Sequence, residues 1–170
     1  MEFCTNGNPW IVGLPLNDSG SLIELKAFQL ISIVNGSKES HKQLELKGML
    51  FTYEMSELSR LLVEIAVFVR NNIDLGLLSY PDPMFNMETK VGCLLKNLKN
   101  IDNCIDLTIR EACNKIIHAK HINFDLEEGI SLGKYDYLNP FVYLYGDYQD
   151  KDWKAQIDIN TFVATLMNVI

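Results

Sequence analysis

Three polar residues at four-residue intervals have the types and spacing that could do chemistry. Arg110, Asn114 and His118 occupy positions i, i+4 and i+8 of one predicted helix, so their side chains form a single column along it. Arginine holds a phosphate by paired hydrogen bonds, an amide orients it, and histidine accepts or donates a proton near neutral pH. The column therefore predicts a site that binds a phosphodiester and transfers a proton.

The segment around this column resembles the signature of a known family. The run from Cys113 to Ala119, Cys-Asn-Lys-Ile-Ile-His-Ala, is similar to the motif of HEPN domains, in which an arginine, commonly followed by asparagine, precedes a histidine on a late helix. HEPN domains are helical bundles whose active members are metal-independent RNases, often dimers, in phage defence, toxin–antitoxin pairs or RNA processing. The resemblance implies that Asn114 is the polar residue of the motif and His118 its histidine.

The motif departs from the family at one position. Cys113 stands where the family has its arginine, and cysteine supplies neither a permanent positive charge nor a two-pronged contact to phosphate. Arg110, three residues earlier, is the arginine that could reach the same site from the preceding turn. The resemblance thus predicts either an RNase rebuilt around Arg110 or a relative that has lost RNase activity.

Two other interpretations of the column stay open. The chain could be a non-catalytic module that dimerises or binds a protein encoded in the same operon, or an interaction protein of unrelated helical topology. In the purely structural interpretation, Arg110 pairs with a carboxylate and His118 interacts with the carbonyl groups at the helix end. RNA at a local site, a second copy of the chain and an operon-encoded protein are therefore the expected partners.

Sites of other kinds are not expected. The spacing of Cys104, Cys113, His118 and His121 matches no zinc pattern, and Cys113 is predicted to be a small buried residue of the core. The sequence contains no phosphate-cradling glycine loop, no G-x-S-x-G and no H-E-x-x-H. We therefore predict neither a metal nor a cofactor.

Composition indicates a globular cytoplasmic protein. The chain has 170 residues, 48 % of them hydrophobic, and a net charge of −7, which argues against broad DNA or RNA binding because such binding neutralises phosphates with Lys and Arg. No apolar segment is long enough to span a bilayer, and the N-terminus lacks the pattern of a signal peptide. The four cysteines form no C-x-x-C pair and are expected to be reduced.

The hydrophobic pattern predicts a mainly α, α+β fold in a single domain, 1–170. An extended arm, 1–20, precedes a helical bundle of about four helices over 21–120, with helices expected at 22–35, 43–71, after 86, and at 104–119. Residues 121–170 are predicted to form a small antiparallel β-hairpin or three-stranded sheet, from strands at 121–126, 141–145 and 153–159, followed by a C-terminal helix.

Several side chains carry more specific expectations. Leu58 and Ile65 belong to the apolar stripe of the helix at 43–71, whereas Glu54 lies outside the stripe and is expected to face water. His41 is expected to be exposed. The aromatic residues of the strands, among them Tyr143, Tyr145 and Trp153, are interpreted as core and cross-strand packing in preference to base stacking, since no Lys or Arg alternates with them within a strand.

Overall fold

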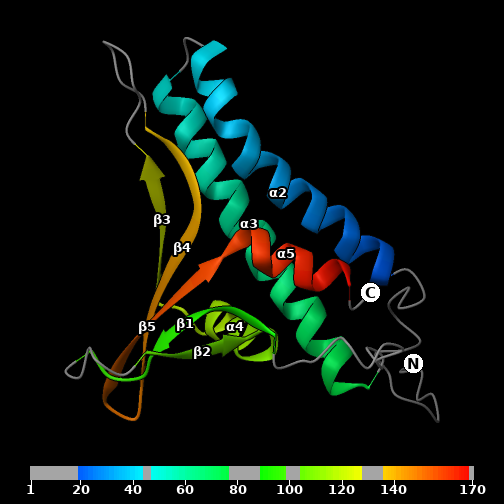
Figure 1. The fold of residues 1–170 in the computed structure, drawn as a ribbon, viewed down its shortest axis with the longest axis vertical. Coiled ribbons are helices and arrows are strands. Elements are labelled where there is room, and N and C mark those ends of the chain that lie inside the picture. Colours follow the sequence, from blue (N-terminus) through cyan, green and yellow to red (C-terminus); the bar gives the residue numbers. More distant parts are fainter. Residues whose placement is uncertain (1–18, 44–46, 77–88, 99–103, 128–135, 169–170) are drawn as a thin grey trace, which may run out of the picture.

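The computed structural model describes residues 19–43, 47–76, 89–98, 104–127 and 136–168. The fold is α+β: two long helices are followed by a five-stranded antiparallel sheet with short helices between and after its strands (Figure 1). The expected N-terminal arm, 1–20, lies almost entirely outside the described residues. No helix of the described part is long and apolar enough to cross a membrane.

The two long helices, α2 (Ser19–Gln43) and α3 (Lys47–Asp74), run side by side in opposite directions (Figure 1). The predicted helix at 43–71 is confirmed by α3, whose stripe buries Leu58 and Ile65 completely. By contrast, α2 does not stop at Gly36 as expected. It continues for two further turns because Ser37 and His41 extend its buried side by hydrogen bonds to α3.

The sheet is built from β1 (Lys90–Leu95), β2 (Cys104–Thr108), β3 (His121–Glu127), β4 (Tyr137–Tyr148) and β5 (Lys151–Asp158). Their spatial order is β2-β1-β5-β4-β3, and every neighbouring pair is antiparallel. Two short helices complete the described fold, α4 (Ile109–Ile117) after β2 and α5 (Ile159–Met167) after β5.

The predicted helical bundle is wrong. The segment expected to be the third helix is β1, and the first part of the expected helix at 104–119 is β2, which leaves only 109–117 helical. A β-bulge between Lys90 and Gly92 explains the error, because the extra residue lets Val91 and Leu94, three positions apart, both bury their side chains. Spacing of three residues otherwise favours a helix.

The C-terminal prediction was closer. A β-hairpin, a third strand at 121–127 and a final helix are all present, but in a five-stranded sheet. The polar loop expected at 146–152 is shorter than predicted, since β4 and β5 extend to a two-residue turn. Gln149 and Asp150 form that turn with φ of 50° and 59°, the positive values that a type I′ hairpin turn requires.

All four described helices lie on one side of the sheet, which we call the covered face. On this face Trp153, Ala155 and Ile157 of β5 are buried opposite Gly146, Leu144 and Val142 of β4. We call the other side the open face. It carries Phe141, Tyr143, Tyr145, Lys154 and Gln156, all partly exposed, and no described helix packs on it (Figure 1).

Two cysteines meet on the open face. Cys93 of β1 and Cys104 of β2 form a disulfide across neighbouring strands, with their Cα atoms 6.0 Å apart. The expectation of reduced thiols is therefore wrong for this pair. The register of β1 with β2 brings the two residues together, and nothing in their spacing along the chain indicated it. Cys113 is free and buried.

Candidate phosphate-binding site

The predicted column lies on the exposed edge of α4. Thr108 caps the start of this helix, where its hydroxyl accepts a hydrogen bond from the Glu111 backbone N–H. The opposite side of α4 is buried against the core through Ile109, Ala112, Cys113 and Ile116. Packing of that apolar side turns Arg110, Asn114 and His118 outward, as expected from the helical period. His118 is the C-cap residue, and its backbone N–H donates to the Asn114 carbonyl oxygen, 3.1 Å away.

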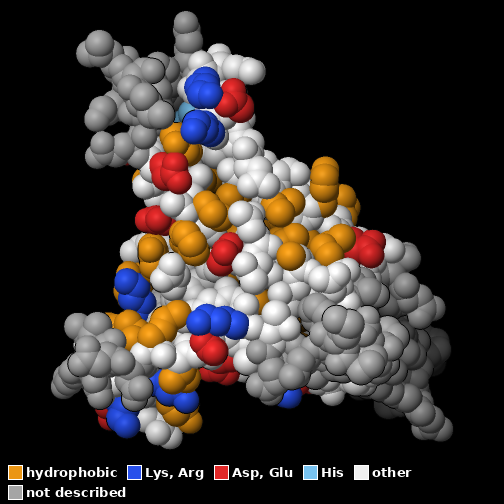
Figure 2. Space-filling model, viewed as in Figure 1, with side chains coloured by type: hydrophobic (Ala, Val, Ile, Leu, Met, Phe, Trp, Pro, Cys, Tyr) orange, Lys and Arg blue, Asp and Glu red, His pale blue; other side chains and the backbone are white. Residues whose placement is uncertain are grey.

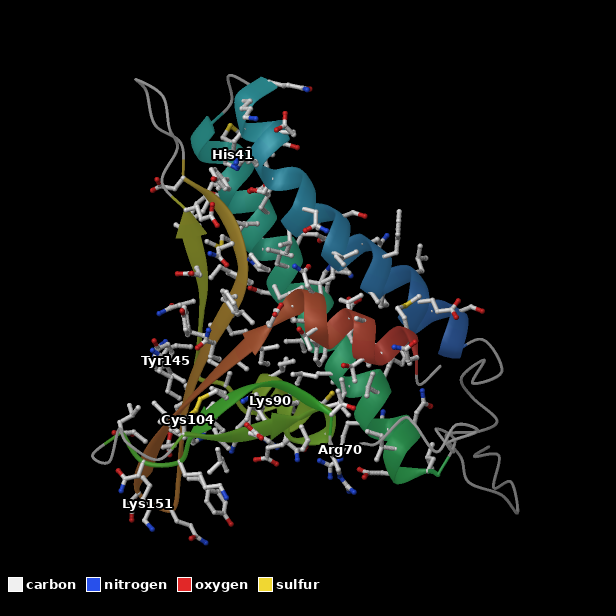
Figure 3. The ribbon with its side chains drawn as sticks, viewed as in Figure 1. His41, Arg70, Lys90, Cys104, Tyr145 and Lys151 are labelled. Atoms are coloured by element: carbon white, nitrogen blue, oxygen red, sulfur yellow. A yellow bond between two sulfur atoms is a disulfide. The ribbon has the colours of Figure 1, made fainter. Side chains whose placement is uncertain are left out.

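Residues of α3 complete the column. The Arg70 guanidinium donates to the side-chain oxygen of Asn114, and its Nε lies 2.7 Å from Asp74 Oδ2. The other oxygen of Asp74 accepts from Arg110 Nη2 at 2.9 Å. Figure 3 shows Arg70 on the part of α3 that lies beside α4. One carboxylate therefore holds two guanidinium groups, one from each helix.

The charges of this cluster do not cancel. Arg70 and Arg110 share the single negative charge of Asp74, which leaves one positive charge. Glu111 is balanced by Lys115, whose Nζ lies 3.3 Å from Glu111 Oε1 and 4.6 Å from the centre of the Trp153 ring. The edge between α3 and α4 is therefore locally positive on a chain whose net charge is −7, and such a site attracts an anion.

Arg70 brings a second guanidinium group to the column, beside Asn114. Because a helix rises about 1.5 Å per residue, His118 lies about 6 Å along α4 from Asn114 and about 12 Å from Arg110. Arg70 contacts Asn114, so its guanidinium is nearer to His118 along the column than that of Arg110. Sequence reasoning missed Arg70 because it lies 44 residues before Asn114. No pattern within its own helix distinguished it.

Cys113 has no catalytic role in this arrangement. Burial raises the pKa of the Cys113 thiol to about 12, although the nearby positive charge of Arg70 acts in the opposite direction. The thiol is therefore neutral and lies within the core, as predicted. Its place next to Asn114 in the sequence does not bring it to the exposed edge.

The predicted residues are not all brought together. Arg110 and Asn114 belong to one hydrogen-bonded cluster with Arg70, whereas the His118 imidazole forms no hydrogen bond or ion pair with the described residues. The structural interpretation is met for Arg110, which pairs with Asp74. At His118 it is the backbone N–H, rather than the imidazole, that contributes to the end of α4. The imidazole is exposed and available to a ligand.

Comparisons with known proteins find nothing similar. No family model, no curated protein and no solved structure matches this chain. The resemblance to HEPN domains therefore stays a prediction based on Asn114 and His118, and the helical bundle that it implies is not the fold of the described residues. The function has to be argued from the cluster itself.

A second polar cluster is buried between α2 and α3, at the other end of the helix pair (Figure 3). Glu54 Oε2 lies 2.8 Å from His41 Nε2 and accepts from the Ser37 hydroxyl at 3.2 Å. The expectations that Glu54 faces water and that His41 is exposed are both wrong, because the Glu54 carboxylate and His41 Nε2 contact each other in the interior. The Ser37 oxygen also accepts from the Leu138 backbone N–H at 3.1 Å.

This buried cluster is not a catalytic triad. In a triad the histidine lies between the hydroxyl and the carboxylate and removes the proton of the hydroxyl. Here Ser37 and His41 both contact the same oxygen of Glu54, so the hydroxyl donates directly to the carboxylate. The cluster links α2, α3 and β4 and has a structural role.

Proposed function

We propose that this protein is an endoribonuclease that cleaves single-stranded RNA at the edge between α3 and α4. Arg70 and Arg110 bind the phosphodiester, Asn114 orients it, and His118 transfers a proton. One observation carries the proposal. Two guanidinium groups from different helices converge on one carboxylate, and Arg70 also contacts an amide that lies one helical turn from an exposed histidine.

RNA suits this set of groups because it carries its own nucleophile. His118 accepts the proton of a ribose 2′-hydroxyl while that oxygen attacks the neighbouring phosphorus. The bond from phosphorus to the 5′-oxygen of the next nucleotide breaks, and the leaving oxygen takes up a proton from solvent water, while His118 later returns its proton to solvent. The products are a 2′,3′-cyclic phosphate and a free 5′-hydroxyl. Arginine donors stabilise the negative charge that develops on the phosphoryl oxygens.

The test is cleavage of an end-labelled single-stranded RNA by the purified full chain, in the presence of a chelator. We expect wild type to cut and to leave a cyclic phosphate. His118→Ala should be slower by about a hundredfold or more, because general acid–base catalysis contributes at least that much. Arg110→Gln should also be slower. Arg60→Gln is the matched control, since Arg60 is an exposed arginine of α3 paired with Glu57 and Glu64, away from the site.

The result that contradicts the proposal is equally direct. If His118→Ala cleaves as fast as wild type, any activity belongs to a contaminant or to another site. If wild type does not cut RNA at high protein concentration, the cluster does not catalyse this reaction. Equal thermal stability of the variants shows that the loss is not one of folding.

One observation favours a second function, that of a non-catalytic dimerisation module. Large apolar side chains are exposed on α2 and α5, namely Leu25, Phe28 (65 % exposed) and Met167. Figure 2 shows hydrophobic side chains gathered across the middle of the face formed by these helices. If wild type is inactive on RNA and Phe28→Glu converts a dimer to a monomer in analytical ultracentrifugation, this second function replaces the first.

A further inference from the structure

We infer that the open face of the sheet binds the unpaired bases of the RNA whose backbone is held at α4. This inference rests on the proposed function and adds a second binding surface. It concerns a part of the molecule that the α3–α4 cluster does not include.

Aromatic rings stand in a row on the open face. Phe141, Tyr143 and Tyr145 occupy alternate positions of β4, so their side chains share one side of the sheet at intervals of about 7 Å. All three are partly exposed, and Figure 3 shows Tyr145 on the side of the sheet away from the helices. Trp153, in contrast, is buried on the covered face. Trp153 belongs to the core as interpreted, whereas Tyr143 and Tyr145 are half-buried outside the core and pack across strands against Lys154.

The positive charge missing from β4 itself comes from the neighbouring strand. Lys154 of β5 lies with its Nζ 4.6 Å from the centre of the Tyr143 ring and 5.6 Å from that of Tyr145. The sequence pattern did not reveal this cation, because Lys154 belongs to a different strand from Tyr143 and Tyr145. Rings with a lysine beside them are the combination that proteins use to stack bases and hold the adjoining phosphates.

A hollow of about 330 Å³ continues the row at Phe141. Lys90, Gly92, Gln156 and Asp158 contribute to its wall. Its volume lies at the lower end of the range for small-ligand sites, which suits a single nucleoside. The Gln156 amide offers both donors and an acceptor, the groups that read the edge of a base, and Phe141 offers a ring for stacking.

Asp158 and Asp106 of this face have partners of their own, and Asp147 and Asp152 of the hairpin lie on the same side near Lys120. Asp158 accepts hydrogen bonds from the backbone N–H groups of Asn160 and Thr161 at 3.0 and 3.3 Å and so caps α5. Asp106 pairs with Lys90 at 2.6 Å. Lys154 has no ion pair within the described residues, so its charge is available to a phosphate. The position of Lys154 beside the two tyrosine rings, rather than the overall charge of the face, favours a stacked base with its adjoining phosphate at this point.

The open face is continuous with the site at α4. His118 ends α4, and His121, three residues later, begins β3 directly opposite Tyr145 in the sheet. The Lys120 backbone N–H donates to the Tyr145 carbonyl oxygen at 2.8 Å, and this hydrogen bond holds the segment between α4 and β3 against β4. A strand of RNA that passes His118 can therefore turn around the edge strand and lay its next bases on Tyr145 and Tyr143.

The experiment is fluorescence anisotropy with the full chain and a labelled 2′-O-methyl oligonucleotide, which lacks the 2′-hydroxyl and cannot be cut. We expect the single strand to bind, and Tyr143→Leu and Tyr145→Leu each to weaken binding about tenfold. Gln156→Leu should change the preference among oligomers of the four bases. Tyr53→Leu and Tyr148→Leu are matched controls at exposed tyrosines elsewhere and should bind within about twofold of wild type.

The outcomes separate this inference from the proposed function. If both tyrosine variants bind the oligonucleotide as tightly as wild type, the inference that the open face binds bases is wrong. The same holds if wild type binds a duplex of the same sequence equally tightly. Either result contradicts the inference even when RNA cleavage depends on His118. If binding depends on the tyrosines but wild type does not cut RNA, only the catalytic proposal is contradicted. If wild type does not bind the oligonucleotide, the inference is overturned. If wild type is then also a dimer that Tyr143→Leu dissociates, the open face is an interface between two copies of the chain.

Discussion

At the scale of single residues, the candidate site depends on the fork of donors that arginine presents. Arg70 uses Nε on Asp74 and Nη1 on Asn114, which leaves further N–H groups for a phosphate. Lysine has one compact charge and no planar fork, so it cannot hold both partners in the same geometry. The proposed site therefore depends on the position of the Arg70 guanidinium, and not on its charge alone.

Arg70→Lys tests that distinction. We expect the variant to keep its fold and to lose about tenfold or more in kcat/KM for RNA, because one ammonium group cannot contact Asp74, Asn114 and a phosphate together. Arg60→Lys, on the outer side of the same helix, should be unaffected. Equal rates for Arg70→Lys and wild type would show that charge alone suffices.

The raised pKa of Cys113 leads to a second prediction at this scale. A folded-state pKa of about 12 lies above that of an unfolded thiol, near 8.5, so the folded state binds the proton more tightly. The stabilisation is complete below about pH 8.5 and is lost as the pH rises toward 12. Urea melts should show wild type losing stability over this range more steeply than Cys113→Ala. Parallel curves for the two proteins would contradict the burial of the thiol.

At the scale of elements, β1 depends on one glycine. A β-carbon at position 92 would overlap the Gln156 carbonyl oxygen of β5, which belongs to the backbone and cannot rotate away. Gly36, in the middle of α2, has no neighbour within 4 Å of an added β-carbon. An alanine therefore clashes with the backbone at position 92 but has room at position 36.

Gly92→Ala should lower the free energy of unfolding by about 2 kcal/mol or more, since the pairing of β1 with β5 must shift. Gly36→Ala should raise it by about 0.5–1 kcal/mol, because alanine is the better helix former. Urea denaturation of both variants measures the difference. A Gly92→Ala protein as stable as wild type would mean that β1 does not pair with β5 in this register.

The disulfide joins β1 and β2 across the segment between them. Closing a loop of about 12 residues stabilises a protein by about 3 kcal/mol in the chain-entropy treatment. The double variant Cys93→Ser/Cys104→Ser should lose about that much, and a reductant should destabilise wild type but not the double variant. Thermal melts with and without dithiothreitol decide the matter, and a wild type insensitive to reductant would show that the thiols do not pair.

At the scale of the whole molecule, an acidic chain carries a small positive edge. The net charge of −7 repels a polyanion in general, so the proposed RNA binding would have to come from the few groups at α3 and α4 and from the open face. All described helices cover the same side of the sheet, and none of them packs on the open face. The arrangement favours short single strands over long duplexes.

Salt dependence tests this view of the molecule. If Arg70, Arg110 and Lys154 neutralise three phosphates, the logarithm of the binding constant should fall against the logarithm of salt concentration with a slope of about −2.1. The double variant Arg70→Gln/Arg110→Gln should keep a slope of about −0.7, which comes from Lys154. Anisotropy titrations at several salt concentrations give both values. A wild-type slope several times steeper would indicate a broad electrostatic surface and contradict a local site.

The sequence alone predicted those helices and strands whose apolar residues recur with a regular period. The stripe of α3 predicted that helix and its buried Leu58 and Ile65, and alternation predicted the hairpin of β4 and β5. The same period placed Arg110, Asn114 and His118 on one exposed edge. These features were predictable because neighbours in sequence determine which side chains share a face.

Tertiary structure alone decided the remainder. A bulge made β1 resemble a helix, and only its pairing with β2 and β5 shows it to be a strand. Glu54 is buried because His41 comes from another helix, and Arg70 reaches Asn114 across 44 residues. Periodicity describes one element at a time, whereas a polar side chain is satisfied by whichever element packs beside it. The contacts that Arg70 and His41 make with residues of other helices could therefore be identified only from the tertiary structure.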